Sequence, residues 1–218
     1  MSRWYSKRGT GVKTKIPIKD DKQLEQLMTY LLMKRDNETE EIKRYERDRD
    51  WFFVLLGINF AFRTQDLLEL KVSDLERGYV CIRENKTGKV QNFRMNKYLY
   101  QDFKDYVDRN HLTRNEYLFT SQKGYRKKPI SRQQMNNRLK EAADELKLPV
   151  NLSCYTLRKT FAYRYIKAGN NINTLSKMLN HDSVEVTQRY ICWGSDDAEN
   201  DRADIYIGGI HRKKSNKK

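Results

Sequence analysis

Long apolar runs are absent from this chain of 218 residues. Its most apolar stretch, residues 51–62, is interrupted by Asn59 and followed by Arg63, whereas about 18 consecutive apolar residues are needed to cross a bilayer. The first residues lack the apolar segment of a secretion signal. We therefore expect no membrane as a partner, and residues 51–62 predict a helix of the protein core instead.

Cysteine is also scarce. Cys81, Cys154 and Cys192 lie far apart, form no CxxC pair and belong to no cluster with histidines at the spacing of metal ligands. An odd number of cysteines in this arrangement argues against a complete disulfide framework and predicts small buried side chains. We expect no metal site, and we expect a reducing, cytoplasmic compartment.

Acidic side chains are missing from both ends of the chain. Residues 1–19 contain six basic residues and no acid, and residues 211–218 contain five basic residues and no acid. The formal net charge of +15 is therefore concentrated in two tails around a nearly balanced body. Because basic groups displace counterions from a polyanion, the tails predict duplex DNA as a partner; tails that only keep the protein in solution are the alternative.

Apolar periodicity predicts a mainly α fold with one small antiparallel β-sheet (α+β). Residues 79–85 and 90–95, with Gly88 between them, indicate a β-hairpin. Ser131 and Gln134 are spaced as a capping box, and Gly169 is placed to end a helix. Thr64 is the expected N-cap of a short helix. Helices are expected near 21–33, 36–50, 51–61, 64–70, 96–109, 132–147, 156–168, 172–179 and 184–192.

Four short segments carry the residue types that cleavage of a phosphodiester without a metal requires. Such cleavage needs guanidinium groups for the phosphate charge, a general acid for the leaving oxygen and a nucleophilic hydroxyl. The segments are FAFRTQD with Arg63, ENKTGK with Lys86, YTLRKTFA with Arg158, and MLNHDSVEVTQRYI with His181 and Tyr190.

Together these segments resemble the tyrosine recombinase (phage integrase) family, over roughly residues 45–192. The family pattern is Arg, Lys, His-x-x-Arg, His or Trp, and Tyr, and its LRHTFA box resembles LRKTFA here. The 23 residues from Arg158 to His181 and the nine from His181 to Tyr190 also agree with it. Jointly the segments are specific, whereas each alone would be a common coincidence.

The resemblance implies a role for each matched residue. Arg63 and Arg158 would clamp the scissile phosphate, and Lys86 would protonate the leaving 5′ oxygen. His181 would donate to a non-bridging oxygen or orient the phosphate, and Tyr190 would attack phosphorus to form a 3′-phosphotyrosyl link. The tyrosyl ester keeps the bond energy, so no cofactor is expected.

The match is incomplete at Tyr155, where the family has histidine, because tyrosine is a weaker base near neutral pH. We still expect Tyr155 in the catalytic site. Asp66 is expected to brace that site from behind, and Lys89 is an alternative to Lys86 as the general acid. A second departure is that family members usually carry a separate core-binding domain, whereas few residues precede the matched region here.

Residues 117–140 contain seven basic side chains and no acid, interleaved with hydroxyls and amides. That mixture suits phosphate positioning with some contact to bases, and a basic, solvated helix face is the alternative. The predicted DNA-binding residues are Lys123, Arg126, Lys127, Lys128, Arg132 and Lys159.

We predict three parts: a basic N-terminal arm (1–19), a catalytic domain (20–192), and a C-terminal segment with a basic tail (193–218) that docks on a neighbouring protomer or folds back in cis. The predicted function is that of a site-specific DNA recombinase or integrase. It would act as a homotetramer on DNA, with a monomer as the free form, and on the nucleoid in a prokaryote. A non-catalytic DNA-binding regulator on the same fold and a type IB topoisomerase-like relaxing enzyme are the alternatives.

Overall fold

The computed structural model describes residues 16–121 and 128–191. Cys192, the C-terminal segment 193–218 and most of the predicted arm therefore lie outside the described residues. The last residues of the predicted arm pack against the body, because Ile18 is buried and its backbone N–H donates to Thr160 Oγ1 at 2.9 Å. In the described part of the chain, no helix combines the length and apolarity needed to span a bilayer.

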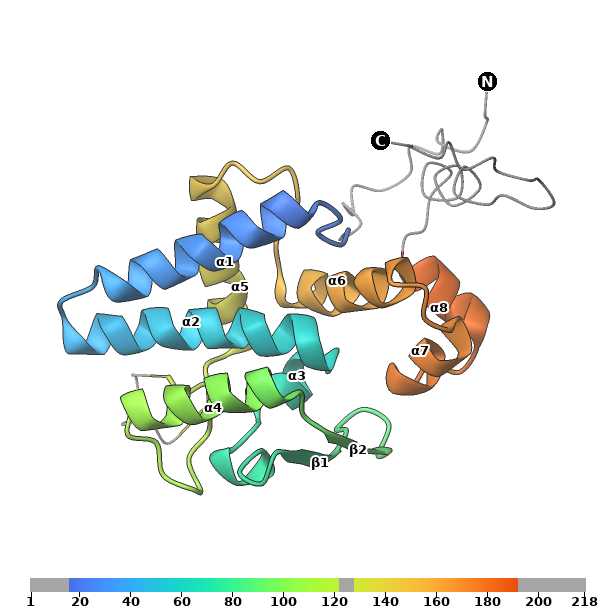
Figure 1. Cartoon of the computed structure of the whole chain (residues 1–218), viewed down its shortest axis with the longest axis horizontal. Helices are drawn as coiled ribbons and strands as arrows, with labels where there is room; N and C mark the ends of the chain where they lie inside the picture. Colours follow the sequence, from blue (N-terminus) through green and yellow to red (C-terminus); the bar gives the residue numbers. More distant parts are fainter. Residues whose placement is uncertain (1–15, 122–127, 192–218) are drawn as a thin grey trace, which may run out of the picture.

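The fold is mainly helical with a single two-stranded antiparallel sheet among the described residues, which confirms the predicted fold class. Helices α1 and α2 lie side by side, α6 packs on α2, and α7 and α8 cover one end of α6 (Figure 1). The elements are α1 (Asp21–Asp36), α2 (Glu41–Phe60), α3 (Thr64–Leu68), a 3-10 turn (Val72–Asp74), β1 (Tyr79–Arg83), β2 (Val90–Arg94), α4 (Lys97–Arg109), α5 (Arg132–Glu145), α6 (Cys154–Lys167), α7 (Ile172–Met178) and α8 (Val184–Ile191).

Local sequence signals account for most element ends. Ser131 Oγ accepts from the Gln134 N–H and Gln134 Oε1 accepts from the Ser131 N–H, both at 3.2 Å, so the predicted capping box is confirmed. Gly88 and Gly169 have positive φ values of 65° and 79°, which suits the hairpin turn and the end of α6. Thr64 was expected to be an N-cap, but it is the first residue of α3, and Arg63 holds the cap position without a side-chain hydrogen bond to the helix backbone.

The charged stretch before residue 51 does not form a separate helix, because α2 runs through it into the apolar stretch. Three of its charged side chains, Asp48, Arg49 and Asp50, are buried. Asp48 accepts from Arg109 Nη2 at 3.0 Å, and Asp50 accepts from Arg138 Nε at 2.7 Å. These buried charges are tolerated because each has a charged partner, and they link α2 to α4 and α5.

The core lies between α2 and its neighbours. Phe52 stacks on Tyr106 of α4 with ring centroids 4.3 Å apart, and Phe53 meets Phe119 edge to face at 5.1 Å. Gly57 allows α2 and α6 to approach closely, because a Cβ built there would lie 2.7 Å from Leu157 Cδ1. This close packing sets the end of α2, which leads to Arg63, beside the first turns of α6.

Candidate active site

Arg63 is presented by a sharp change of direction after α2. The helix ends at Phe60, and Ala61 adopts a left-handed conformation with φ of 55° before the chain enters α3. The Arg63 side chain is 22% exposed, and its Nη1 donates to Glu84 Oε2. The guanidinium therefore pairs with a buried carboxylate, while part of the Arg63 side chain remains exposed.

Glu84 is a site residue that the sequence analysis missed. Its side chain is fully buried at the end of the hairpin strand, where it accepts from Thr87 Oγ1 at 2.6 Å and from Gln91 Nε2 at 3.1 Å. Burial raises its pKa, but these hydrogen bonds and the charge of Arg63 outweigh burial, so the pKa lies below its ordinary value. Its only sequence signal is a carboxylate two residues before Lys86.

Asp66 connects α3 to the hairpin turn. Its Oδ1 accepts from the backbone N–H of Asn85 at 2.8 Å, and Asn85 Nδ2 donates to Glu69 at 2.8 Å. Burial raises the pKa of Asp66. Asp66 thus fixes the backbone of the residue that immediately precedes Lys86, and its supporting role in the site stays a prediction. Lys86 itself is exposed in the turn, and the described residues provide no hydrogen bond or ion pair for its side chain.

Arg158 lies on α6, buried at 4% exposure. Its Nη1 donates to the Ala61 carbonyl at 2.5 Å, and its Nη2 donates to the Leu179 carbonyl at 2.7 Å. Burial lowers the pKa of Arg158, and the nearby charge of Arg63 lowers it further. Arg158 therefore joins the chain reversal before Arg63 to the segment before His181, which lie far apart in the sequence.

His181 and Tyr190 meet next to Arg158. The two ring centroids are 5.0 Å apart at 70°, and the Arg158 guanidinium carbon is 6.0 Å from the Tyr190 ring centroid. His181 Nδ1 is hydrogen-bonded to Thr187 Oγ1 at 2.9 Å. Burial, aided by the charges of Arg158 and Arg63, lowers the pKa of His181 to about 4. The imidazole is therefore neutral near pH 7.

Tyr190 lies at the end of α8 and is 8% exposed. Its ring packs edge to face against Tyr155 of α6, with ring centroids 5.3 Å apart. Burial raises the pKa of Tyr190, whereas the charge of Arg158 lowers it. Tyr155, which takes the place of the family's histidine, is half-exposed. The predicted nucleophile, Tyr190, is buried against the ring of Tyr155.

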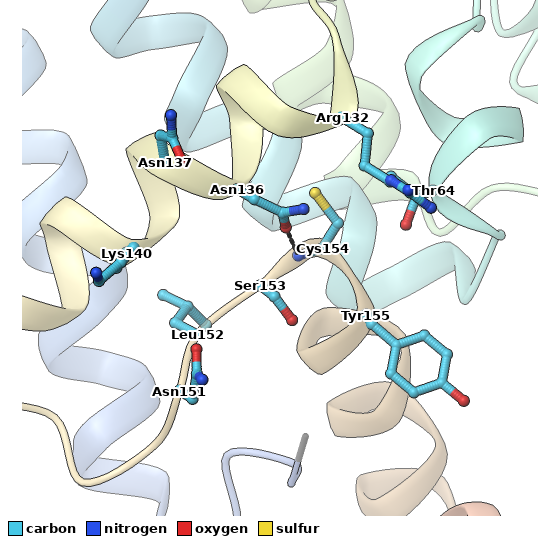
Figure 2. A pocket seen from close by; sticks show the side chains of 10 residues that line it. All are labelled: Thr64, Arg132, Asn136, Asn137, Lys140, Asn151, Leu152, Ser153, Cys154 and Tyr155. Atoms are coloured by element: carbon cyan, nitrogen blue, oxygen red, sulfur yellow. Dashed lines mark hydrogen bonds between the residues drawn. The ribbon is translucent and has the colours of Figure 1, made fainter. Parts of the chain in front are cut away.

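A polar groove of about 430 Å³ opens beside this cluster, and Figure 2 shows Tyr155 at one end of it. Arg132 and Lys140 of α5 line it, as does Thr64, the neighbour of Arg63. Asn136 Oδ1 accepts from the Cys154 backbone N–H at 3.0 Å, which ties α5 to the first turn of α6 (Figure 2).

The predicted DNA-binding residues are distributed unevenly. Lys128 and Arg132 are exposed. Lys159 is 5% exposed, and its ammonium lies over the Tyr155 and Tyr190 rings. Lys123, Arg126 and Lys127 lie outside the described residues. The structure thus brings together Arg63, Asp66, Tyr155, Arg158, His181 and Tyr190 with the unforeseen Glu84, and it holds the turn of Lys86 at their edge.

Comparisons with known proteins identify the family and the fold of the chain. The phage integrase family model matches residues 19–193. The probable integrase/recombinase YoeC of Bacillus subtilis is 35% identical over 175 residues, which are 78% of this chain and 93% of YoeC. Tyrosine recombinase XerA of Thermococcus kodakarensis is 29% identical over 159 residues, and the match spans 69% of this chain but 55% of XerA.

Solved structures show the same fold. A crystal structure of XerA recombinase superposes with a TM-score of 0.69 at 18% identity and covers 90% of this chain and 66% of XerA. The catalytic domain of bacteriophage HP1 integrase superposes with a TM-score of 0.55 at 18% identity and covers 87% of this chain and 95% of that domain. On the family match and the similarity to YoeC, the chain belongs to the phage integrase family, the family of the tyrosine recombinases.

Proposed function

We propose that this chain cleaves and rejoins duplex DNA at specific sites through a 3′-phosphotyrosyl intermediate on Tyr190. The observation that carries the proposal is the convergence of Arg158 with His181 and Tyr190, which come from two distant segments, with Arg63 from a third segment beside them. Relatives named as recombinases support it, as do solved structures of similar fold described as a recombinase bound to its difH DNA substrate.

The two arginines suit a pentavalent phosphate. A guanidinium has five N–H donors, so the two carbonyl bonds of Arg158 leave further donors for non-bridging oxygens. Those carbonyl bonds also fix the guanidinium before DNA arrives, and a preorganised donor stabilises developing charge most strongly. Arg63 is held by Glu84 in the same way, but its exposed side leaves room for a phosphate.

The proton path follows from the state of His181. Its Nδ1 is engaged by Thr187, so Nε2 is the nitrogen that remains for the reaction. The neutral imidazole accepts the phenol proton at Nε2 as Tyr190 Oη bonds to phosphorus, and the imidazolium then donates to a non-bridging oxygen. The bond from phosphorus to the 5′ oxygen breaks, and the ammonium of Lys86 protonates that leaving oxygen.

DNA would follow the groove beside Tyr155. Arg132 and Lys140 place two positive charges along it, and exposed Lys128 precedes α5. We infer phosphate contacts for these residues and for Lys123, Arg126 and Lys127, since contacts of this type position a protein without reading sequence. Strand exchange between two duplexes requires a homotetramer on DNA, and we place the reaction in the cytoplasm.

The test is trapping of the covalent intermediate on a nicked suicide substrate. The wild-type chain is expected to form a protein–DNA adduct, and Tyr190→Phe is expected to form none while its DNA affinity is kept, because only the attacking oxygen is removed. Tyr98→Phe, at an exposed tyrosine of α4, is the matched control and should react like the wild type. An adduct with Tyr190→Phe would refute the assignment of the nucleophile, and a wild-type chain that binds DNA without any adduct would favour a non-catalytic regulator.

A further inference from the structure

We propose that Lys159 is a positioning residue for this cleavage: its buried ammonium stabilises the negative charge that develops on the Tyr190 phenol during attack. The inference rests on the proposed function and assigns to Lys159 a role other than DNA contact. Lys159 transfers no proton in this role, so the atoms and electrons of the cleavage step balance as described above.

The geometry of two helices carries this inference. Tyr155 and Lys159 are four residues apart on α6, which places them on the same face of the helix, and that face meets Tyr190 of α8. Lys159 Nζ lies 5.4 Å from the Tyr190 ring centroid and 5.6 Å from the Tyr155 ring centroid. One ammonium group therefore contacts both rings of the edge-to-face pair.

Burial of Lys159 strengthens the interaction of its ammonium with the neighbouring phenol rings. The Lys159 side chain is almost completely removed from solvent, and a buried charge requires surroundings that stabilise it. The faces of two phenol rings supply such surroundings, and an ammonium over a ring is attracted more strongly as that ring gains electron density. Because little water screens the contact, the attraction grows as Tyr190 loses its proton.

The other groups that face Tyr190 supply little positive charge to stabilise its phenolate. Tyr155 and Arg158 of α6 and His181 between α7 and α8 face the phenol, and Arg63 and Glu84 act in turn on Arg158 and His181. Burial raises the pKa of Tyr190 and so opposes formation of its phenolate. Of the facing groups only Arg158 carries a positive charge near pH 7, and it also has to bind the phosphate.

The experiment measures the rate constant of adduct formation by the full chain at saturating suicide substrate, from about pH 6 to about pH 10. Lys159→Met keeps the length of the side chain without its charge, and Lys159→Arg keeps the charge. At neutral pH we expect Lys159→Met to be slower by about tenfold or more, which is a barrier increase of about 1.4 kcal/mol. Because the phenol ionises less readily without the ammonium, the rise of the Lys159→Met rate with pH should be displaced to higher pH by about one unit, whereas Lys159→Arg should retain most of the rate.

Lys177→Met, at an exposed lysine of α7, is the matched control and should leave the rate and the pH profile unchanged. A role in folding alone would lower the melting temperature of Lys159→Met without moving its pH profile. The inference is overturned if Lys159→Met keeps the wild-type profile within about twofold, or if Lys159→Arg, which keeps the charge, loses as much rate as Lys159→Met. A wild-type chain that forms no adduct overturns the proposed function and this inference together, so the two failures are distinguishable.

Discussion

Removal of the Glu84 carboxylate is expected to destabilise the fold and to release Arg63. Glu84 is fully buried and accepts hydrogen bonds from Arg63, Thr87 and Gln91. In Glu84→Ala all three donors lose this carboxylate, although Gln91 Nε2 still donates to the Met178 carbonyl at 2.9 Å, and the guanidinium keeps its charge without its partner. The hairpin would then be less firmly joined to the segment that carries Arg63.

The expected loss of stability depends on how deeply Glu84 and Arg63 are each buried. Loss of one partner of a buried ion pair costs about 3–5 kcal/mol when the other stays buried. Since Arg63 is partly exposed, water relieves some of this cost, so we expect about 3 kcal/mol for Glu84→Ala. For a chain of this length that is a fall in melting temperature of roughly 6–12 °C. Glu84→Gln keeps the volume and one acceptor oxygen, so its cost should be smaller, about 1–2 kcal/mol.

Chemical denaturation of the DNA-free protein measures these costs. Glu76→Ala is the matched control, because Glu76 also accepts from an arginine, Arg114 at 2.8 Å, but both side chains are exposed. Surface pairs contribute about 0–1 kcal/mol, so this variant should resemble the wild type. Glu84→Ala within about 1 kcal/mol of the wild type, or no more destabilised than Glu76→Ala, would refute the assignment of a buried, preorganising ion pair.

Two further predictions concern packing and pH. Gly57→Ala should lower stability by about 1–3 kcal/mol, because its Cβ would lie 2.7 Å from Leu157 Cδ1; a melting temperature equal to or above that of the wild type would contradict the close approach of α2 and α6. The pKa of His181 is lowered from 6.5 to about 4, so between these two pH values the unfolded chain binds more protons than the folded chain. The free energy of unfolding should therefore fall as pH drops through this range. After allowance for solvent screening, we expect a loss of roughly 1–2 kcal/mol. His181→Gln should flatten this part of the pH–stability curve, and an unchanged slope would show that other groups cause it.

Elements with a local physical cause were predictable. The capping box of α5 and the positive φ values of Gly88 and Gly169 depend on a few adjacent residues, and each was found where the sequence indicated. The cap predicted at Thr64 was wrong by one residue, because the left-handed Ala61 shifts the start of α3 so that Arg63 takes the cap position. No local pattern signals a left-handed alanine.

Residues whose roles depend on partners far along the chain were not predictable. Glu84 lies about 20 residues from Arg63, and Asp48 lies 61 residues from Arg109, so no periodicity relates them. The charged half of α2 resembles a solvated face in sequence, yet Asp48 and Asp50 are buried against arginines of other helices. In the sequence Lys159 resembles a surface cation. Only the packing of α8 on α6 places its ammonium over the rings of both Tyr155 and Tyr190.

The sequence by itself determined which side chains are candidates for the chemistry, since the types and spacing of Arg63, Arg158, His181 and Tyr190 can be read along the chain. Only the tertiary structure decided their charge states and mutual positions. Burial of His181 next to Arg158 makes the imidazole neutral, and the carbonyls of Ala61 and Leu179 orient the arginine. The physical reason is that desolvation and charge–charge interaction depend on distance in space, and a one-dimensional pattern does not contain that distance.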